Sequence, residues 1–312
     1  MSISPEQCSV HTHSDLCDGR DPLEAMAAAA FDAGVRYFGS SGHSHTPIPH
    51  DAGNVLPEDL TDYRTRLERL REEYRGRMEV LLGIEQDSCS PQPVPDWADY
   101  WIGSVHNLYD PATGTYHCVD WDREKLASCR DEMFRGDALA MAEGYYADVA
   151  AMAARHPTIL GHIDLVTKFN EPAAFFDETA PRYRAAALAA LEAADPVRTL
   201  LEVNTGAVSR GYRTVPYPAQ FLLRAWRERG GDIILTADSH RTDTVAWGYR
   251  QAADWARAAG YTRCVVLTLS GREICPLDLP AKWRKKARLL PRLLSLCGLR
   301  TVVGPATMGE KI

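Results

Sequence analysis

Histidines and acidic residues gather directly after short apolar segments of this sequence. Seven of the ten histidines lie within a few residues of such a segment's end. Imidazole and carboxylate groups together are typical ligands of divalent transition metals. The candidate ligands read from these positions are His11, His13, His43, Glu85, His106, His162, Asp238 and His240.

The spacing of these candidates supports a shared site. His11 and His13 lie two residues apart, as do Asp238 and His240, so each pair projects from one face of an extended segment. Glu85 follows the apolar run EVLLGI, where an unpaired carboxylate would be costly and a cation would compensate it. In the string HSH at 43–45 one histidine suffices, and His43 is favoured over His45 because it is closer to the strand.

Strands and helices alternate along the chain. Strands are predicted at 8–12, 35–40, 79–84, 100–105, 158–163, 199–204, 232–237 and 263–269. Helices are predicted at 21–34, 57–75, 137–155, 181–194, 218–230 and 244–260. This alternation favours right-handed βαβ units closing into a TIM-like barrel, with an open doubly wound sheet as the competitor. In a barrel the carboxyl ends of all strands open on one face, so the candidate ligands would converge there.

Three segments fall outside this alternation. Residues 107–136 are predicted to form a long loop with some helix, and 164–181 a second such excursion. The barrel is expected to occupy 1–279, and 280–312 is expected to be a basic amphipathic C-terminal appendage.

Composition narrows the class of protein. A chain of 312 residues that is 45% hydrophobic can form a large folded core. Its net charge of -7 argues against an extended nucleic-acid partner. No apolar run is long enough to span a membrane and no secretion signal is evident, so we expect a cytoplasmic protein. Its eight scattered cysteines indicate reduced thiols, and its oligomeric state cannot be read from the sequence.

Seven strings in order resemble the PHP family, named for polymerase and histidinol phosphatase domains. They are HTHSDLCDG (11–19), SGHSH (41–45), GIEQD (83–87), GSVH (103–106), GHID (161–164), EVNTG (202–206) and TADSH (236–240). The co-occurrence of SVH, GHID and EVNTG, with no polymerase domain, is most similar to the histidinol-phosphatase branch. The resemblance implies an α/β fold of PHP type, a distorted TIM-like (β/α)7 barrel with a trinuclear metal centre.

The resemblance also implies how the ligands divide among three divalent ions, with Glu85 bridging two of them. The implied sets are His11, His13, Glu85 and Asp238; Glu85, His106 and His162; and Asp18, His43 and His240. Asp15 is the alternative to Asp18, and Gly42 stands where many members carry an acid. Zn, Mn and Fe all suit such ligands.

A centre of this kind would bind a small phosphate ester and hydrolyse it without a side-chain nucleophile. Glu85, Asp238 and His240 are the candidate catalytic residues. Candidates for binding the substrate or its phosphate are Arg210, Arg213, Lys168 and Asp164. Asp164 would either orient His162 or accept the cationic amine of an amino-alcohol phosphate.

The implied activity is metal-dependent hydrolysis of a phosphoric monoester, L-histidinol phosphate, to L-histidinol and phosphate in histidine biosynthesis. The alternative within enzymes is a PHP-type phosphoesterase that acts on nucleotides or other small phosphate esters. A metal-binding protein without turnover is the alternative outside enzymes.

Overall fold

One sheet runs through the computed structural model, which describes residues 3–48 and 53–277. Eight of its strands are parallel and follow one another in chain order. They are β1 (Cys8–Ser9), β2 (Tyr37–Ser40), β3 (Glu79–Asp87), β4 (Tyr100–Ser104), β7 (Ile159–Leu160), β8 (Leu200–Asn204), β9 (Ile233–Thr236) and β10 (Arg263–Thr268). Each coincides with a predicted strand.

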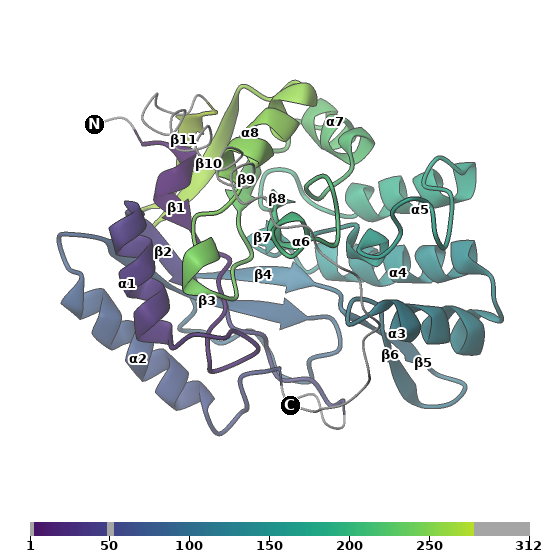
Figure 1. The fold of residues 1–312 in the computed structure, drawn as a ribbon, viewed down its shortest axis with the longest axis horizontal. Helices are drawn as coiled ribbons and strands as arrows, with labels where there is room; N and C mark the ends of the chain where they lie inside the picture. The colour runs from purple at the N-terminus through teal and green to yellow at the C-terminus, as the bar shows by residue number, and fades with distance from the viewer. Residues whose placement is uncertain (1–2, 49–52, 278–312) are drawn as a thin grey trace, which may run out of the picture. The chain divides into compact units, whose positions relative to one another are not determined.

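The residues that follow β1 contact the loop after β9, so the two sides of the curled sheet approach each other. The amide of His13 donates to the carbonyl of Ser239, 2.8 Å away, and the amide of Ser239 donates to the carbonyl of His11 at 3.1 Å. These bonds join the residues after the first strand to the loop that follows β9. Figure 1 shows the sheet with the helices around it. The predicted distorted α/β barrel is therefore confirmed.

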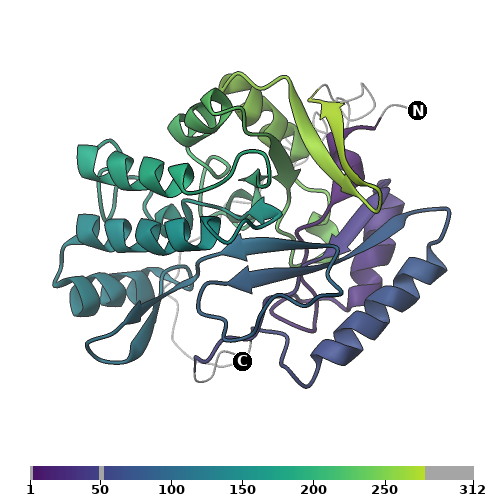
Figure 2. The same cartoon turned by 180° about the vertical axis from the view of Figure 1, so that it is seen from behind.

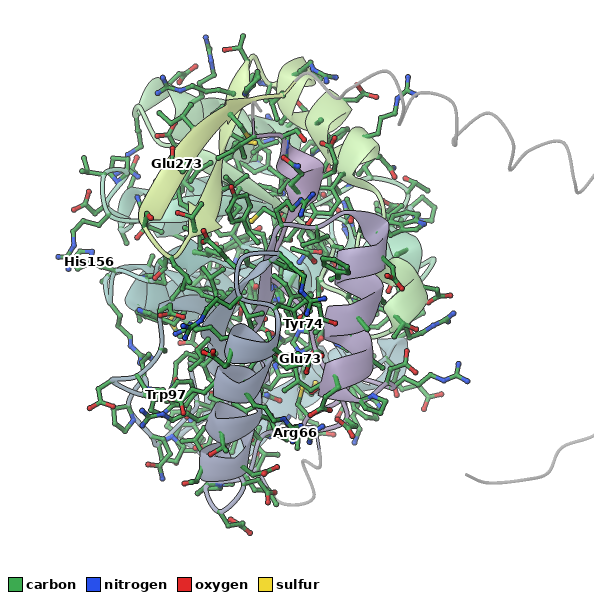
Figure 3. All side chains as sticks on the ribbon, turned by 90° about the vertical axis from the view of Figure 1, so that its left-hand side faces the viewer. Arg66, Glu73, Tyr74, Trp97, His156 and Glu273 are labelled. Atoms are coloured by element: carbon green, nitrogen blue, oxygen red, sulfur yellow. The ribbon has the colours of Figure 1, made fainter. Side chains whose placement is uncertain are left out.

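The helices cover the outside of this curled sheet. The longer ones are α1 (Leu23–Ala33), α2 (Leu60–Glu73), α4 (Ala138–Ala153), α5 (Pro181–Glu192), α7 (Gln220–Glu228) and α8 (Tyr249–Ala258). Figure 3 shows α1 and α2 side by side, with Arg66 labelled beside them. Arg66 of α2 binds Glu24 of α1 through a 2.6 Å contact, and the buried side chains of Met26, Phe38 and Leu67 belong to the apolar core beneath them.

Irregular connections distort the barrel. Residues 88–99 link β3 to β4 without a helix. The strand β11 (Gly271–Pro276), which was not predicted, pairs antiparallel with β10 and is seen from behind in Figure 2. The other helical elements of the described residues are short. They are α3 (Arg123–Ser128) and α6 (Gly206–Ser209), a π-helical turn at Cys129–Met133 and 3-10 turns at Pro5–Gln7, Leu165–Thr167 and Thr242–Thr244.

The segment 107–136 contains the helix that was expected there, in α3 and the π-helical turn, but it also contains two strands where a loop was expected. Strands β5 (Asn107–Asp110) and β6 (Thr115–Cys118) form an antiparallel hairpin. The side chain of Asp110 accepts hydrogen bonds from the Ala112 amide and the Thr113 hydroxyl, and Gly114 has φ +71°. The turn at DPATG therefore stabilises the hairpin locally.

The described residues belong to one compact unit, Met1–Asp278. The appendage predicted at 280–312 lies outside the described residues. None of the helices in 3–48 and 53–277 has both the length and the apolar character needed to cross a membrane.

Candidate metal centre

Nine histidine and carboxylate side chains meet at the carboxyl ends of the parallel strands. They come from different elements, and they meet because all strands of a parallel barrel end on the same face. They are His11 and His13 after β1, Asp18 before α1, His43 after β2, Glu85 in β3, His106 after β4, His162 after β7, and Asp238 and His240 after β9. These are the nine residues predicted as ligands.

Glu85 lies at the middle of the cluster, with no solvent-exposed surface. Its Oε2 is 3.2 Å from His11 Nε2 and 3.2 Å from His43 Nδ1. Its Oε1 is 3.0 Å from His162 Nε2 and 3.4 Å from His106 Nε2. One carboxylate therefore faces imidazoles on both of its oxygens, which is the position of a bridging ligand.

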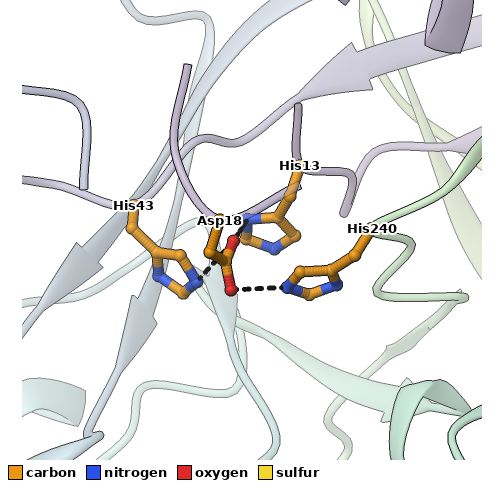
Figure 4. Close-up of side chains that lie close together, drawn as sticks. All are labelled: His13, Asp18, His43 and His240. Carbon is orange, nitrogen blue, oxygen red and sulfur yellow. Dashed lines mark hydrogen bonds and ion pairs between the residues drawn. The ribbon is translucent and has the colours of Figure 1, made fainter. Parts of the chain in front are cut away.

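Asp18 holds a second group of imidazoles together (Figure 4). Its Oδ1 lies 3.5 Å from His13 Nδ1 and 3.5 Å from His43 Nε2, and its Oδ2 lies 3.0 Å from His240 Nε2. Asp15 points elsewhere, because its Oδ1 accepts the amide hydrogen of Leu23 at the start of α1. The geometry therefore favours Asp18 over Asp15 as a ligand.

Asp238 closes the cluster from β9. Its Oδ1 lies 3.6 Å from His11 Nε2 and 3.4 Å from His13 Nε2. Asp238 has φ +48°, and a Cβ at Gly206 would stand 2.5 Å from its Oδ2. The strained backbone and the glycine beside it show that this carboxylate is held in place at a conformational cost, as is common at functional sites.

Two further carboxylates support the imidazoles from behind and were not predicted. Glu202 Oε1 lies 2.5 Å from His11 Nδ1, and its Oε2 accepts the backbone amide of His162 at 2.6 Å. Asp87 Oδ2 lies 2.8 Å from His106 Nδ1. Such contacts fix which imidazole nitrogen faces the cluster. Two features of the sequence could have indicated them: Glu202 is an acid within the apolar run TLLEVN, and Asp87 follows Glu85 by two residues.

The buried charges of the cluster shift one another's protonation. Burial opposes ionisation of Glu85, but the neighbouring imidazoles lower the pKa of this carboxyl well below its ordinary value. Burial lowers the pKa of His43, yet the carboxylates of Glu85 and Asp18 raise it to about 9. Burial and the charges of His240 and His43 lower the pKa of His13 to about 3. The carboxylates therefore favour positive charge beside them, whereas His13 stays neutral, and bound cations would supply that charge while leaving the imidazoles deprotonated as ligands.

The donor set fits divalent metal ions. The nine residues fall into four overlapping groups of three or four whose ligand atoms lie within 4.8 Å of one another. The Nε2 atom of His13 is buried without a hydrogen-bond partner, which a metal ion would satisfy. Mixed imidazole and carboxylate sites of this kind bind divalent transition metals.

An inner cavity of about 400 Å³ opens over the cluster. Lys168 and Arg210, two predicted phosphate-binding residues, line it together with Trp121 and Tyr212. Arg210 Nη2 also contacts Asp238 Oδ2 at 3.1 Å. Both cations lie where an anion in the cavity would meet them.

Arg213 and Asp164 are not among the lining residues of the inner cavity, and the substrate-binding roles expected of them stay predictions. Arg213 donates to the carbonyl and hydroxyl of Thr167, so its guanidinium ties two loops together. Asp164 Oδ2 accepts the amide hydrogen of Ala219 at 2.8 Å and does not orient His162 among the described contacts. Burial raises the pKa of Asp164 to about 6, although Arg213 acts in the opposite direction.

Three other histidines of the described residues belong to none of the four ligand groups. His117 is in β6, 3.3 Å from the Thr115 hydroxyl, and His156 is labelled at the edge of the molecule in Figure 3. His45 also belongs to none of the four ligand groups found in the described residues. His50 lies outside the described residues.

Known proteins resemble this chain in sequence. The chain is 30% identical over 266 residues to a probable histidinol-phosphatase of Deinococcus radiodurans, a match that covers 81% of this chain and 94% of that protein. It is 24% identical over 267 residues to the histidinol-phosphatase of Bacillus subtilis, covering 77% and 95% of the two chains.

Solved structures share its fold. A putative histidinol phosphatase from Listeria monocytogenes matches with a TM-score of 0.63 at 18% identity, over 77% of this chain and 98% of that one. A histidinol phosphate phosphatase from Lactococcus lactis, complexed with zinc, L-histidinol and phosphate, matches with a TM-score of 0.57 at 16% identity, over 85% and 98%.

The model of the PHP domain matches residues 9–206, a span that contains Asp18 and six of the histidines and acids at strand ends. Together with the relatives and the distorted barrel, this match identifies the family: the chain belongs to the PHP domain proteins.

Proposed function

We propose that this chain is a metal-dependent histidinol-phosphatase, which hydrolyses L-histidinol phosphate to L-histidinol and phosphate. The observation that carries the proposal is the nine-residue cluster in a PHP fold, beneath a cavity with two cationic side chains. The relatives named for this activity support the choice of substrate.

The ligand sets proposed from sequence are compatible with the observed contacts. Glu85 would bridge two ions, because its two oxygens face different imidazoles. Asp18, with His43 and His240, would hold a third ion. Zn, Mn and Fe are the proposed metals, since all accept imidazole and carboxylate ligands. When bound, they would polarise the phosphoryl oxygens and lower the pKa of water towards neutrality.

The chain's own residues would position the ester. Arg210 would bind the phosphate through paired N–H groups while its contact with Asp238 holds it over the cluster. Lys168 is held by the Asp120 carbonyl at 2.6 Å and would add a positive charge at the cavity wall. Asp238 and His240 lie where they could orient the attacking water and move a proton.

The test is phosphate release by the purified protein, first stripped by a chelator and then reconstituted with Zn, Mn or Fe. We expect two to three equivalents of bound metal by elemental analysis, and kcat/KM for histidinol phosphate far above that for nucleoside phosphates or aryl phosphates. Chelator-resistant turnover would contradict the metal centre. A preference for nucleotides would replace the substrate with the alternative phosphoesterase activity. A biosynthetic phosphatase of this kind would act in the cytoplasm, which cell fractionation tests.

A further inference from the structure

A second cavity, of about 810 Å³, adjoins the inner cavity on the side of the β5–β6 hairpin. We call it the hairpin cavity. Residues of β6, α3 and the π-helical turn line it, among them His117, Ser128 and Glu132. The two cavities share five lining residues, which are Asp18, His43, His106, Asp120 and Trp121. A ligand that is bound over the metal-ligand cluster can therefore extend into the hairpin cavity.

The two cavities differ in charge. Lys168 and Arg210 line the inner cavity and are absent from the described lining of the hairpin cavity. Asp87 and Glu132 show the reverse distribution. Lys125 is the one lysine or arginine in the described lining of the hairpin cavity, and its side chain is exposed to solvent. The inner cavity is also lined by metal-ligand carboxylates, so it would suit an anion once the proposed ions are bound, whereas the hairpin cavity, with four carboxylates and one lysine in its described lining, suits a cation.

Glu132 keeps its charge available to a ligand. Its Oε1 accepts a hydrogen bond from the Ser128 hydroxyl at 2.6 Å, while its Oε2 is 3.9 Å from His117 Nδ1. Its side chain is 66% exposed and makes no contact with an arginine or lysine among the described residues. A carboxylate so placed can pair with an ammonium group that enters the cavity.

Trp121 stands at the boundary between the cavities. It lines both of them, and 71% of its surface is exposed, which is unusual for so large an apolar side chain. An indole face attracts cations and stacks on flat rings. Asp120, which also lines both cavities, already contacts Lys168 Nζ at 3.2 Å through its carboxylate. The indole of Trp121 is therefore the side chain that a ligand can contact at this boundary.

We propose that the hairpin cavity binds the organic part of the substrate, a cationic amino alcohol with a flat ring, while the inner cavity holds its phosphoryl group. Glu132 and Trp121 both face this cationic part. This inference rests on the proposed function and assigns the specificity for the alcohol to residues outside the metal-ligand cluster. The cavity is large enough, because typical ligand pockets measure roughly 300–1,000 Å³.

The test compares two phosphate esters on the metal-loaded protein. Histidinol phosphate carries a cationic alcohol, and glycerol phosphate carries a neutral one. Glu132→Lys should raise KM for histidinol phosphate at least about fivefold, an effect of surface-charge size, and leave KM for glycerol phosphate within about twofold. The matched control is Glu124→Lys, which makes the same charge change at an exposed position of α3 outside the described lining of both cavities.

Calorimetry provides a readout without turnover. Free L-histidinol has no phosphate, so the dependence of its binding on Glu132 and Trp121 reports on the hairpin cavity. Its Kd should rise at least about fivefold in Glu132→Lys and in Trp121→Ala, and should stay at the wild-type value in Glu124→Lys. Both substituted side chains are largely exposed, and thermal unfolding checks that the variants fold.

The outcomes separate the two proposals. If the wild type hydrolyses histidinol phosphate but neither variant changes KM or the Kd of histidinol, the hairpin-cavity assignment is wrong and the proposed function stands. If the wild type does not hydrolyse histidinol phosphate, the proposed function is wrong. In that case, histidinol binding that is lost in Glu132→Lys still supports a cation site in the hairpin cavity, and binding that is unaffected overturns it.

Discussion

Glu85→Gln is the sharpest perturbation of the proposed centre. It preserves the shape of the side chain but removes the negative charge that faces His11 and His43 on one oxygen and His162 on the other, at 3.0 to 3.2 Å. A neutral amide also turns one oxygen into an N–H donor, which cannot bind a metal. Two of the three proposed sites should therefore weaken together.

Glu85→Gln should reduce activity more than removal of a residue that only orients a metal ligand. Removing a group that only orients a metal ligand costs about 10–100-fold. Removing a bridging ligand should cost at least about 10³-fold in kcat/KM, which corresponds to about 4 kcal/mol. Metal content should fall from two to three equivalents to about one, since the group around Asp18 retains its other ligands.

The assay is phosphate release from histidinol phosphate, together with elemental analysis of the same preparations. Glu73→Gln is the control, because it removes the same charge from an exposed position at the end of α2 (Figure 3). It should leave both quantities at wild-type values. Full metal content and a near-normal rate in Glu85→Gln would refute the bridging role.

Three further predictions concern residues around the cluster. Glu202→Gln should weaken metal affinity about 10–100-fold, because Glu202 contacts His11 Nδ1 and the His162 amide; metal titration measures this, and unchanged affinity would remove its positioning role. Arg210→Ala should raise KM more than it lowers kcat if its contact with phosphate is equal in the ground and transition states, and a loss confined to kcat would contradict this. Asp164→Asn should alter the pH dependence of stability. Since burial raises the folded-state pKa of Asp164 to about 6, the folded protein binds the proton more tightly, and wild-type stability falls as pH rises from about 4 to 6. The variant should lose a fall of about 2 kcal/mol between pH 4.5 and 7.5, because the full effect of about 3 kcal/mol needs a pH below the unfolded-state pKa. Denaturant unfolding of wild type and variant at these two pH values measures the difference, and parallel pH profiles would contradict a buried carboxyl with a raised pKa.

Local patterns in the sequence determined the fold and the location of the cluster. Alternating apolar strands and amphipathic helices predict a parallel barrel, and a parallel barrel directs the residues after each strand to one face. For this reason the sequence pattern alone places His43, His106 and His162 together, although they are far apart in the chain. The folded chain brings these side chains together, and their role as metal ligands stays a proposal.

Only the tertiary structure decided which side chains face one another. Glu202 lies opposite His11, and Arg213 donates hydrogen bonds to Thr167 and is not among the residues that line the inner cavity. Asp164 bonds the Ala219 amide, which lies 55 residues further along the chain. Strand periodicity gives the face on which a residue lies, but its contacts depend on the register between neighbouring strands and on loop paths, which involve residues remote in sequence. The hairpin cavity has the same origin, since the DPATG turn stabilises the hairpin locally while the packing of β6 and α3 beside the cluster determines what it can bind.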